Sequence, residues 1–395
     1  MLFRDLKRQY EYIKTPIDSV IAEVISAAHF ISGEQVKILE TTLASYVGVK
    51  HCITCANGTD AISIALMAYG IGSDDAVFVP DFTFFSSGEC PATVGATPIF
   101  VDVNKDTYNM DSQSLTFEIK KVLDEGKLIP RAVVAVDLFG QPFDYGSIRS
   151  ICNKYGLLLI EDAAQGFGGH ITFSDGTVKM ACSLGDIATT SFFPAKPFGC
   201  YGDGGAIFTN DDAIASLCRS IAIHGKDMEH PDDLNAKYNN VRLGMNSRLD
   251  TLQAGVLLAK FPIFRDEELE TVNHVAKLYT EMLKTVESLK IPMVEKEMYS
   301  SWAQYTVQLP QSIDRGCIQR QLKEKGIPTN IYYMKPMHKQ VAFQDTRSAV
   351  ANCTVTERLC ESVLCLPIHP YLKDEEIFEV CDVLKKTIRT FTSIR

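Results

Sequence analysis

Short apolar runs recur along the first half of the chain, and they constrain the fold more than any other feature of the sequence. A polar or helix-like segment follows each run, and the runs span residues 52–55, 76–79, 97–103, 132–136, 157–160, 187–191 and 205–208. Continuous apolar strands that are joined by helices predict an α/β fold with a mostly parallel central sheet and helices on both faces. Ligands bind at the carboxyl ends of the strands in such sheets. The residues that directly follow the runs are therefore the first candidates for a functional site.

The rest of the chain predicts helices before this sheet and a second unit after it. Apolar residues at helical spacing over residues 17–47 predict two helices that flank a turn at Ser32 and Gly33. A capping residue, Asn246 or Ser247, is expected to open a long helix that carries the chain away from the sheet. Later residues combine helix-like stretches at 318–325 and 374–387 with a strand-like stretch at 303–309. We therefore expect a large domain at residues 1–262 and a smaller α+β domain at residues 263–395.

The overall charge argues against two classes of partner. The formal net charge is −10 and the pI is about 5.4, whereas binding to nucleic acids or to membrane surfaces relies on clustered positive charge. No apolar run approaches the roughly 20 residues that a membrane span requires, and the first residues lack the apolar region of a signal peptide. We expect a cytoplasmic protein whose partners include neither nucleic acid nor membrane.

The twelve cysteines are scattered through apolar segments, which predicts free, buried thiols and no disulfides. Cys52 and Cys55 form one C-x-x-C pattern, but no second pair follows at the spacing of a zinc site. The sequence therefore predicts no metal site.

A candidate phosphate site lies at residues 57–60, Asn-Gly-Thr-Asp, where a strand ends and a helix begins. A helix amino terminus with Gly58 for close approach and the Thr59 hydroxyl suits a phosphate group. The same four residues are also an ordinary helix cap. Neither G-x-x-x-x-G-K-[ST] nor a G-x-G-x-x-G after the first strand occurs, which argues against nucleotide hydrolysis and dinucleotide binding.

Lys196 is the only lysine in an apolar stretch that is followed by several glycines on its C-terminal side. Most lysines are solvated at the surface, but Phe192, Phe193 and Phe198 would remove water from this amine. A desolvated lysine loses its proton easily and becomes a nucleophile. The glycines between residues 199 and 205 also allow the backbone to fold closely around a ligand.

Asp162, which follows the run at 157–160, is the matching candidate for a cofactor ring. It could simply cap a loop. Facing a pyridinium about 4 Å away, it would contribute roughly 4 kcal/mol of attraction at an effective dielectric of 20, enough to keep the ring nitrogen protonated. Ala164 is small enough for a flat ring to lie against it, Gln165 could bond a phenolic oxygen, and Phe84 could stack on the ring. Together with Lys196, these residues predict a pyridoxal phosphate site.

Four motifs, in order and spacing, resemble the DegT/DnrJ/EryC1/StrS family of sugar aminotransferases. They lie at residues 57–60, 161–165, 191–205 and 244–254, and the similarity extends from residue 5 to residue 370. The resemblance implies a fold-type I enzyme that uses pyridoxal phosphate, with pyridoxamine phosphate as its second form. Within the family the chain looks like bacterial enzymes that use glutamate to aminate C3 of a UDP-linked 3-oxo-N-acetylhexosaminuronate for polysaccharide precursors.

The resemblance also implies roles for individual residues and a homodimer with its active sites at the subunit interface. Lys196 would bind the cofactor covalently, Asp162 would hold the pyridinium and Gln165 would contact the ring oxygen, while Asn246 would reach the phosphate in the neighbouring subunit and Arg248 would contact the sugar. The implied phosphate ligands are Gly58, Thr59 and Ser191.

The sugar specificity is the point where the chain departs from these relatives. Tyr332 and Tyr333 stand where these relatives carry a His-Tyr pair that touches the sugar, which implies that both tyrosines bind the substrate. Amination of a 4-oxo-6-deoxy or 3-oxo-6-deoxy nucleotide sugar is therefore a second hypothesis, and a non-catalytic regulatory homologue is a third. A sugar dehydratase of this fold would have histidine in place of Lys196. The loop at residues 171–183 is longer than in the relatives and has no predicted role.

Overall fold

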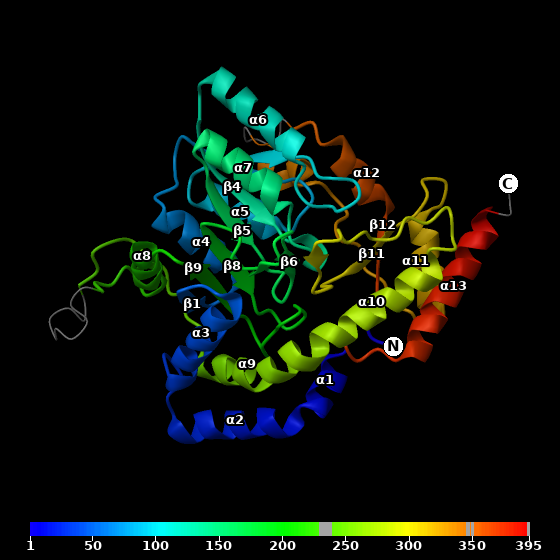
Figure 1. Ribbon diagram of the computed structural model, residues 1–395, viewed down its shortest axis with the longest axis horizontal. Helices are drawn as coiled ribbons and strands as arrows, with labels where there is room; N and C mark the ends of the chain where they lie inside the picture. Colours follow the sequence, from blue (N-terminus) through cyan, green and yellow to red (C-terminus); the bar gives the residue numbers. More distant parts are fainter. Residues whose placement is uncertain (229–238, 345–347, 349–350, 393–395) are drawn as a thin grey trace.

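The computed structural model describes residues 1–228, 239–344, 348 and 351–392. Its centre is a seven-stranded sheet in the order β1-β9-β8-β5-β4-β2-β3 (Figure 1). β9 is antiparallel to β1 and β8, and the other neighbouring strands are parallel. The strands are β1 (His51–Cys55), β2 (Asp75–Pro80), β3 (Thr97–Val101), β4 (Ile129–Val136), β5 (Leu158–Asp162), β8 (Ile187–Ser191) and β9 (Gly205–Thr209). The mostly parallel sheet predicted from the apolar runs is confirmed.

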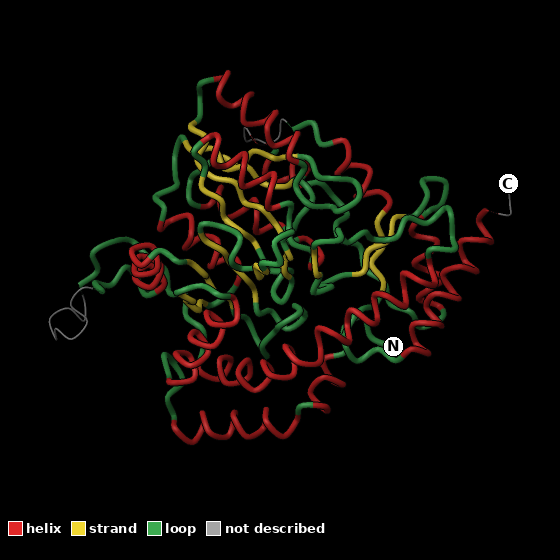
Figure 2. The backbone as a smooth tube through the Cα atoms, viewed as in Figure 1, coloured by secondary structure: helices red, strands yellow, loops and turns green. Residues whose placement is uncertain are grey.

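Helices cover both faces of this sheet, as Figure 2 shows for the strands and the helices around them. Alternate residues of one strand face opposite sides, so Val77 packs with α4 (Gly58–Ala68), α5 (Phe85–Thr93) and α8 (Asp212–Ala222). Phe78 packs on the other side with α6 (Ser112–Glu125) and α7 (Tyr145–Tyr155). α2 (Lys14–Ala27), α3 (Glu34–Val47) and α9 (Thr251–Ile263) cover the β1 end. Burial on both faces explains why the strands are continuously apolar.

A second core lies in the C-terminal part of the chain. The helix α9 continues through a π-helical turn (Phe264–Glu268) into α10 (Leu269–Leu283), which leads away from the sheet (Figure 1). There α10 packs with α11 (Arg315–Glu324), α13 (Asp374–Thr392) and the antiparallel pair β11 (Tyr305–Gln308) and β12 (Val363–Leu366). The helix α12 (Thr354–Ser362) precedes β12, and α1 (Leu6–Tyr12) starts the chain. The division into domains at residues 262 and 263 stays a prediction.

Two local features differ from or add to the sequence-based predictions. The long helix begins at Thr251, not near Asn246, because Ser247 bonds to Ala56 and Ala222 in an extended segment and Asp250 precedes the helix. The predicted start was therefore wrong. The loop at residues 171–183 contains a hairpin of β6 (His170–Thr172) and β7 (Val178–Met180), which pairs with β10 (Met298–Tyr299).

All twelve cysteines are free, and eleven of them are buried, as predicted. Among the described residues, no helix combines the length and the apolar character needed to cross a bilayer.

Candidate active site

A cavity of about 610 Å³ opens where β1, β2, β5 and β8 end. Parallel strands present their carboxyl ends at one edge of a sheet, so residues that are far apart in the sequence meet there. Most of the predicted site residues line this cavity: Gly58, Thr59, Phe84, Asp162, Ala164, Gln165, Ser191, Lys196, Tyr332 and Tyr333. The sheet thus brings the predicted cofactor site together with the two tyrosines of the C-terminal part.

The start of α4 forms one end of the cavity. The Asn57 side chain accepts a hydrogen bond from the backbone N–H of Asp60 over 2.8 Å, so this segment is a helix cap as well as a cavity wall. The Thr59 hydroxyl lies 2.7 Å from that of Ser86. Gly58 has no room for a side chain, because a Cβ there would lie 2.8 Å from Cβ of Ser191. The N–H groups at this helix start, beside the hydroxyls of Thr59, Ser86 and Ser191, form a site for an anion.

Asp162 lies deeper in the cavity and is only 5% exposed. Its Oδ2 accepts a 2.7 Å hydrogen bond from the Ser87 hydroxyl, and its Oδ1 accepts a 3.2 Å bond from the backbone N–H of Ala164. Burial raises the pKa of Asp162, while the Ser87 and Ala164 hydrogen bonds and the charge of Lys196 oppose that rise. A buried carboxylate of this kind is stabilised by a cationic ring nitrogen.

Lys196 lies on the connection between β8 and β9 and faces the same cavity. Burial lowers the pKa of its amine most, Arg4 lowers it further, and Asp162 acts in the opposite direction. Arg4 contacts the backbone of this residue, because its Nη2 donates to the Lys196 carbonyl oxygen over 2.9 Å. A larger fraction of this amine is therefore neutral and nucleophilic than for an exposed lysine.

Gln165 connects the cofactor end of the cavity to the tyrosines. Its Oε1 accepts from the backbone N–H of Phe139 over 2.8 Å, and its Nε2 donates to the Tyr333 hydroxyl over 3.0 Å. One hydrogen of the Gln165 amide remains for a ligand oxygen. The side chain of Tyr333 is thus oriented by the residue predicted to touch the ring.

The geometry fits pyridoxal phosphate. The aldehyde of this cofactor requires an amine, its pyridinium nitrogen a carboxylate and its phosphate a set of donors. Lys196, Asp162 and the amino terminus of α4 supply these three groups around one cavity.

Asn246 and Arg248 do not line this cavity in a single chain. Both side chains are exposed, close in sequence to Leu243, which is 90% exposed, and Val241, which is 50% exposed. The predictions that Asn246 reaches the phosphate in a neighbouring subunit and that Arg248 contacts the sugar stay predictions.

Two neighbours of the site were missed from the sequence. Ser87 lies in the first turn of α5, and the run of hydroxyl residues after β2 is the signal that could have indicated it. Arg4 is 192 residues from Lys196, and no spacing in the sequence relates the two.

A lysine with a lowered pKa, a buried carboxylate and an anion site around one cavity define a pyridoxal-phosphate-dependent enzyme of fold type I. The chain belongs to the DegT/DnrJ/EryC1/StrS aminotransferase family, whose model matches residues 11–385. It is an aminotransferase that uses pyridoxal phosphate.

Known proteins resemble the chain over nearly its whole length. It is 43% identical to the UDP-2-acetamido-2-deoxy-3-oxo-D-glucuronate aminotransferase of Pseudomonas aeruginosa, covering 97% of this chain and 99% of that protein. The crystal structure of a DegT/DnrJ/EryC1/StrS aminotransferase from Brucella abortus has a TM-score of 0.91 at 42% identity, covering 98% and 99% of the two chains. NtdA from Bacillus subtilis, solved with bound pyridoxamine phosphate, has a TM-score of 0.83 at 28% identity, covering 95% of this chain and 82% of that one.

Proposed function

We propose that this enzyme moves the amino group of glutamate to C3 of a UDP-linked 3-oxo-N-acetylhexosaminuronate, a precursor of surface polysaccharide. The observation that carries the proposal is the cavity itself, where Lys196, Asp162 and the anion site meet the tyrosine pair. The 43% identity to an enzyme named for a 3-oxo-glucuronate substrate supports the choice of sugar.

The residues of the chain have distinct tasks in this reaction. When bound, the cofactor supplies a reactive carbonyl carbon and a ring that accepts electrons from the bond being broken. Lys196 would hold the cofactor through that carbon, and its Nζ, when not bound to the cofactor, would carry a proton between the amino-bearing carbon of the substrate and the cofactor. Asp162 keeps the ring nitrogen protonated, and Ser87 holds Asp162 in place. Gly58, Thr59 and Ser191 hold the phosphate group.

The sugar end of the site is completed by a second copy of the chain. Asn246 of one subunit reaches the phosphate of the other subunit's cofactor, and Arg248 contacts an acidic group of the sugar, because a planar guanidinium pairs well with a carboxylate or phosphate. Their exposure on the single chain, next to the exposed Leu243, supports this arrangement.

Substitution of Lys196 tests the chemistry. We expect Lys196→Ala to lose both amino transfer and the visible absorbance of the bound cofactor, whereas the exposed Lys154→Ala should keep both. If Lys196→Ala retained the absorbance and turned over, the assignment of the lysine would be wrong.

A mixture of two inactive variants tests the shared site. Hybrid dimers of Lys196→Ala and Arg248→Ala contain one intact site if Arg248 acts across the interface. About a quarter of the wild-type activity should then return after subunit exchange. No recovery would refute the crossing of Arg248.

The sugar is tested by offering nucleotide oxo-sugars to the pyridoxamine form and following the return of visible absorbance, with mass spectrometry of the products. A 3-oxo uronate should react fastest. Preference for a 4-oxo-6-deoxy or a 3-oxo-6-deoxy sugar would favour the alternative hypothesis of a 6-deoxy sugar substrate. That hypothesis rests on Tyr332, which lines the cavity. Cofactor binding without transfer to any oxo-sugar would favour a regulatory role.

A further inference from the structure

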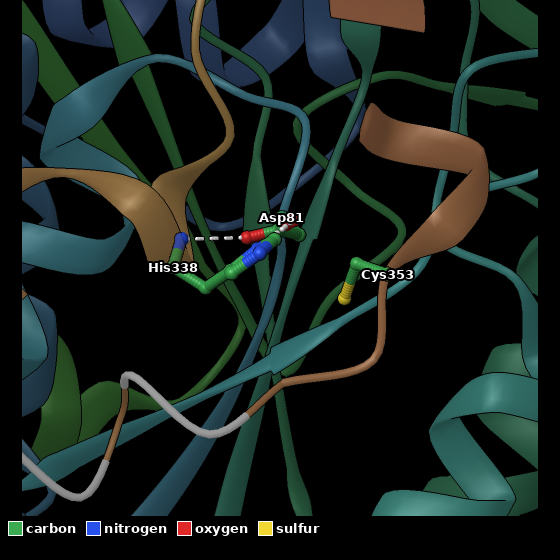
Figure 3. Close-up of side chains that lie close together, drawn as sticks. All are labelled: Asp81, His338 and Cys353. Carbon is green, nitrogen blue, oxygen red and sulfur yellow. Dashed lines mark hydrogen bonds and ion pairs between the residues drawn. The ribbon is translucent and has the colours of Figure 1, made fainter. Parts of the chain in front are cut away.

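The segment that carries Tyr332 and Tyr333 is attached to the large sheet through a buried cluster of Asp81, His338 and Cys353 (Figure 3). Asp81 directly follows β2, His338 lies in the short helix η4 (Met337–Lys339), and Cys353 precedes α12. Their exposed fractions are 1%, 7% and 2%. Three distant parts of the chain therefore meet at a point that water does not reach freely.

Asp81 binds η4 through every oxygen it has. Its Oδ1 accepts from the backbone N–H of His338 over 2.8 Å, and its Oδ2 lies 2.7 Å from Nδ1 of the same residue. The backbone carbonyl of Asp81 accepts from the N–H of Met337 over 3.0 Å. These side chains are of types that bind metals, but here the carboxylate oxygens and Nδ1 are bonded to each other. The arrangement is that of a clamp between two chain segments.

The other nitrogen of His338 faces a second carboxylate. Nε2 lies 3.3 Å from Oε1 of Glu357 on α12, and the same oxygen is 2.9 Å from Nζ of Lys339. Burial acts to lower the pKa of His338, but the hydrogen bond to Asp81 and the charges of Asp81 and Glu357 outweigh it and raise that pKa. Burial raises the pKa of Cys353, so its thiol stays neutral beside the pair. The two carboxylates therefore favour the charged form of the imidazole.

The clamp joins two segments that line the active-site cavity. Thr83 and Phe84, which follow Asp81 in the sequence, line the cavity. Tyr332 and Tyr333, which precede His338, line it as well, and Tyr333 is bonded to Gln165. A change at the clamp would alter the position of the tyrosines relative to Gln165 and the cofactor residues.

We propose that His338, paired with Asp81 and Glu357, is the positioning residue that sets Tyr332 and Tyr333 for the sugar substrate. This inference rests on the proposed function and on the predicted contact of Tyr332 and Tyr333 with the nucleotide sugar. The glutamate half reaction requires Lys196 and Asp162, which the clamp does not touch, so it should proceed without the clamp.

The test uses two variants of the full-length enzyme. His338→Asn keeps an amide near the position of Nδ1 but cannot carry a charge, and Glu357→Gln keeps the bond between His338 and Asp81. For His338→Asn we expect the KM for the nucleotide sugar to rise about tenfold, the size that follows from losing one charge-assisted hydrogen bond. The kcat and the change of cofactor absorbance with glutamate alone should stay near wild type. Glu357→Gln should give a smaller rise in KM.

The pH dependence provides an independent signature. A histidine with a raised pKa holds the clamp at low pH, and the clamp weakens as pH rises through that pKa. The KM of the wild type for the sugar should therefore rise toward alkaline pH. The KM of His338→Asn should be higher than that of the wild type at low pH and should change little with pH. Since activity also depends on other groups, only the difference between the two profiles counts.

Hydrogen exchange tests the clamp without any catalysis. In the cofactor-free protein, backbone amides of residues 330–340 should exchange faster in His338→Asn than in the wild type, while the peptide of α6 stays unchanged. Failure of the glutamate half reaction in the wild type would refute the proposed function and leave this structural test intact. Unchanged exchange together with an unchanged sugar KM would overturn the clamp. So would one tightly bound zinc per chain that is lost in Cys353→Ser, because Nδ1 would then be a metal ligand.

Discussion

Removal of the Ser87 hydroxyl should destabilise the ionised form of Asp162 relative to its protonated form. Ser87 is fully buried, and its Oγ is 2.7 Å from Oδ2 of Asp162. The other direct bond to this carboxylate, from the Ala164 N–H, is longer at 3.2 Å. A hydrogen bond to a charged acceptor contributes about 1.5–3 kcal/mol. Ser87→Ala should therefore cost the ionised carboxylate about 2 kcal/mol.

The sign of the pH effect follows from the direction of the pKa shift. Burial already raises the pKa of Asp162 in the folded protein, and Ser87 lowers it. A carboxyl group whose pKa is raised on folding makes the protein less stable as pH rises from its unfolded value through its folded value. Without the Ser87 hydroxyl the pKa of Asp162 in the folded protein rises further, so the loss of stability continues to higher pH. The stability of Ser87→Ala should thus be closest to that of the wild type at acidic pH and should drop below it as pH approaches neutrality.

Denaturant unfolding of the cofactor-free enzyme at a series of pH values measures this difference. We expect the free energy of unfolding of Ser87→Ala to fall about 2 kcal/mol below wild type near pH 7. In the complete enzyme the proton on the ring nitrogen is held less firmly, so kcat should fall by up to about 30-fold.

Two comparisons separate this effect from a general loss of packing. Ser86→Ala removes the neighbouring hydroxyl, which bonds to Thr59 and to no carboxylate, and its cost should not depend on pH. In an Asp162→Asn background the cost of Ser87→Ala should shrink by about 1 kcal/mol, because the acceptor has no charge. A cost that is independent of pH and unchanged in that background would refute the reasoning.

Three further predictions concern the surroundings of the site. Arg4→Met should raise the pKa of the Lys196 amine and slow cofactor capture at neutral pH, measured as the pH dependence of reconstitution, whereas Arg4→Lys should stay closer to wild type because it keeps the charge. Gly205→Ala should weaken cofactor binding in an equilibrium titration, because its Cβ would lie 2.5 Å from the backbone of Asn57; the control Gly146→Ala, whose Cβ meets nothing nearer than 3.8 Å, should bind normally. Burial and the charge of Arg4 lower the pKa of His369 to about 4. The neutral form of His369 therefore contributes its full stability above about pH 6.5, and the free energy of unfolding should fall by about 3 kcal/mol as pH drops to about 4. His369→Gln should remove that slope from unfolding curves of the wild type.

The strands, and the position of the predicted cofactor residues at one cavity, could be predicted because the physics that places them is local. A strand buried on both faces must be apolar throughout, and the residue that follows it must lie at the ligand-binding edge. Asp162 and Ser191 end their strands, and Lys196 follows Ser191 by five residues. Their meeting at one cavity thus follows from strand pattern and order alone.

Features that depend on distant contacts could not be predicted in this way. The reversed direction of β9 depends on the path of the connection that holds Lys196, which no apolar pattern encodes. The extended segment before α9 depends on the bond between Ser247 and Ala56, which lie 191 residues apart. Ser247 is a capping residue at the right spacing, but its hydroxyl accepts a hydrogen bond from the Ala56 N–H and does not cap a helix.

The two ends of the active site are held by different kinds of structure, and this bears on how the enzyme selects its sugar. At the cofactor end, Asp162 and Ser191 terminate strands of one sheet, so their positions move only if the sheet does. At the proposed sugar end, Tyr332 and Tyr333 lie between regular elements and are held by the Gln165 bond and the contact of η4 with Asp81. Loops held at a few points accept substitutions that a packed sheet does not. The tyrosine pair can therefore differ from a His-Tyr pair while Lys196 and Asp162 stay in place, so the amino-transfer chemistry is a poor guide to the sugar.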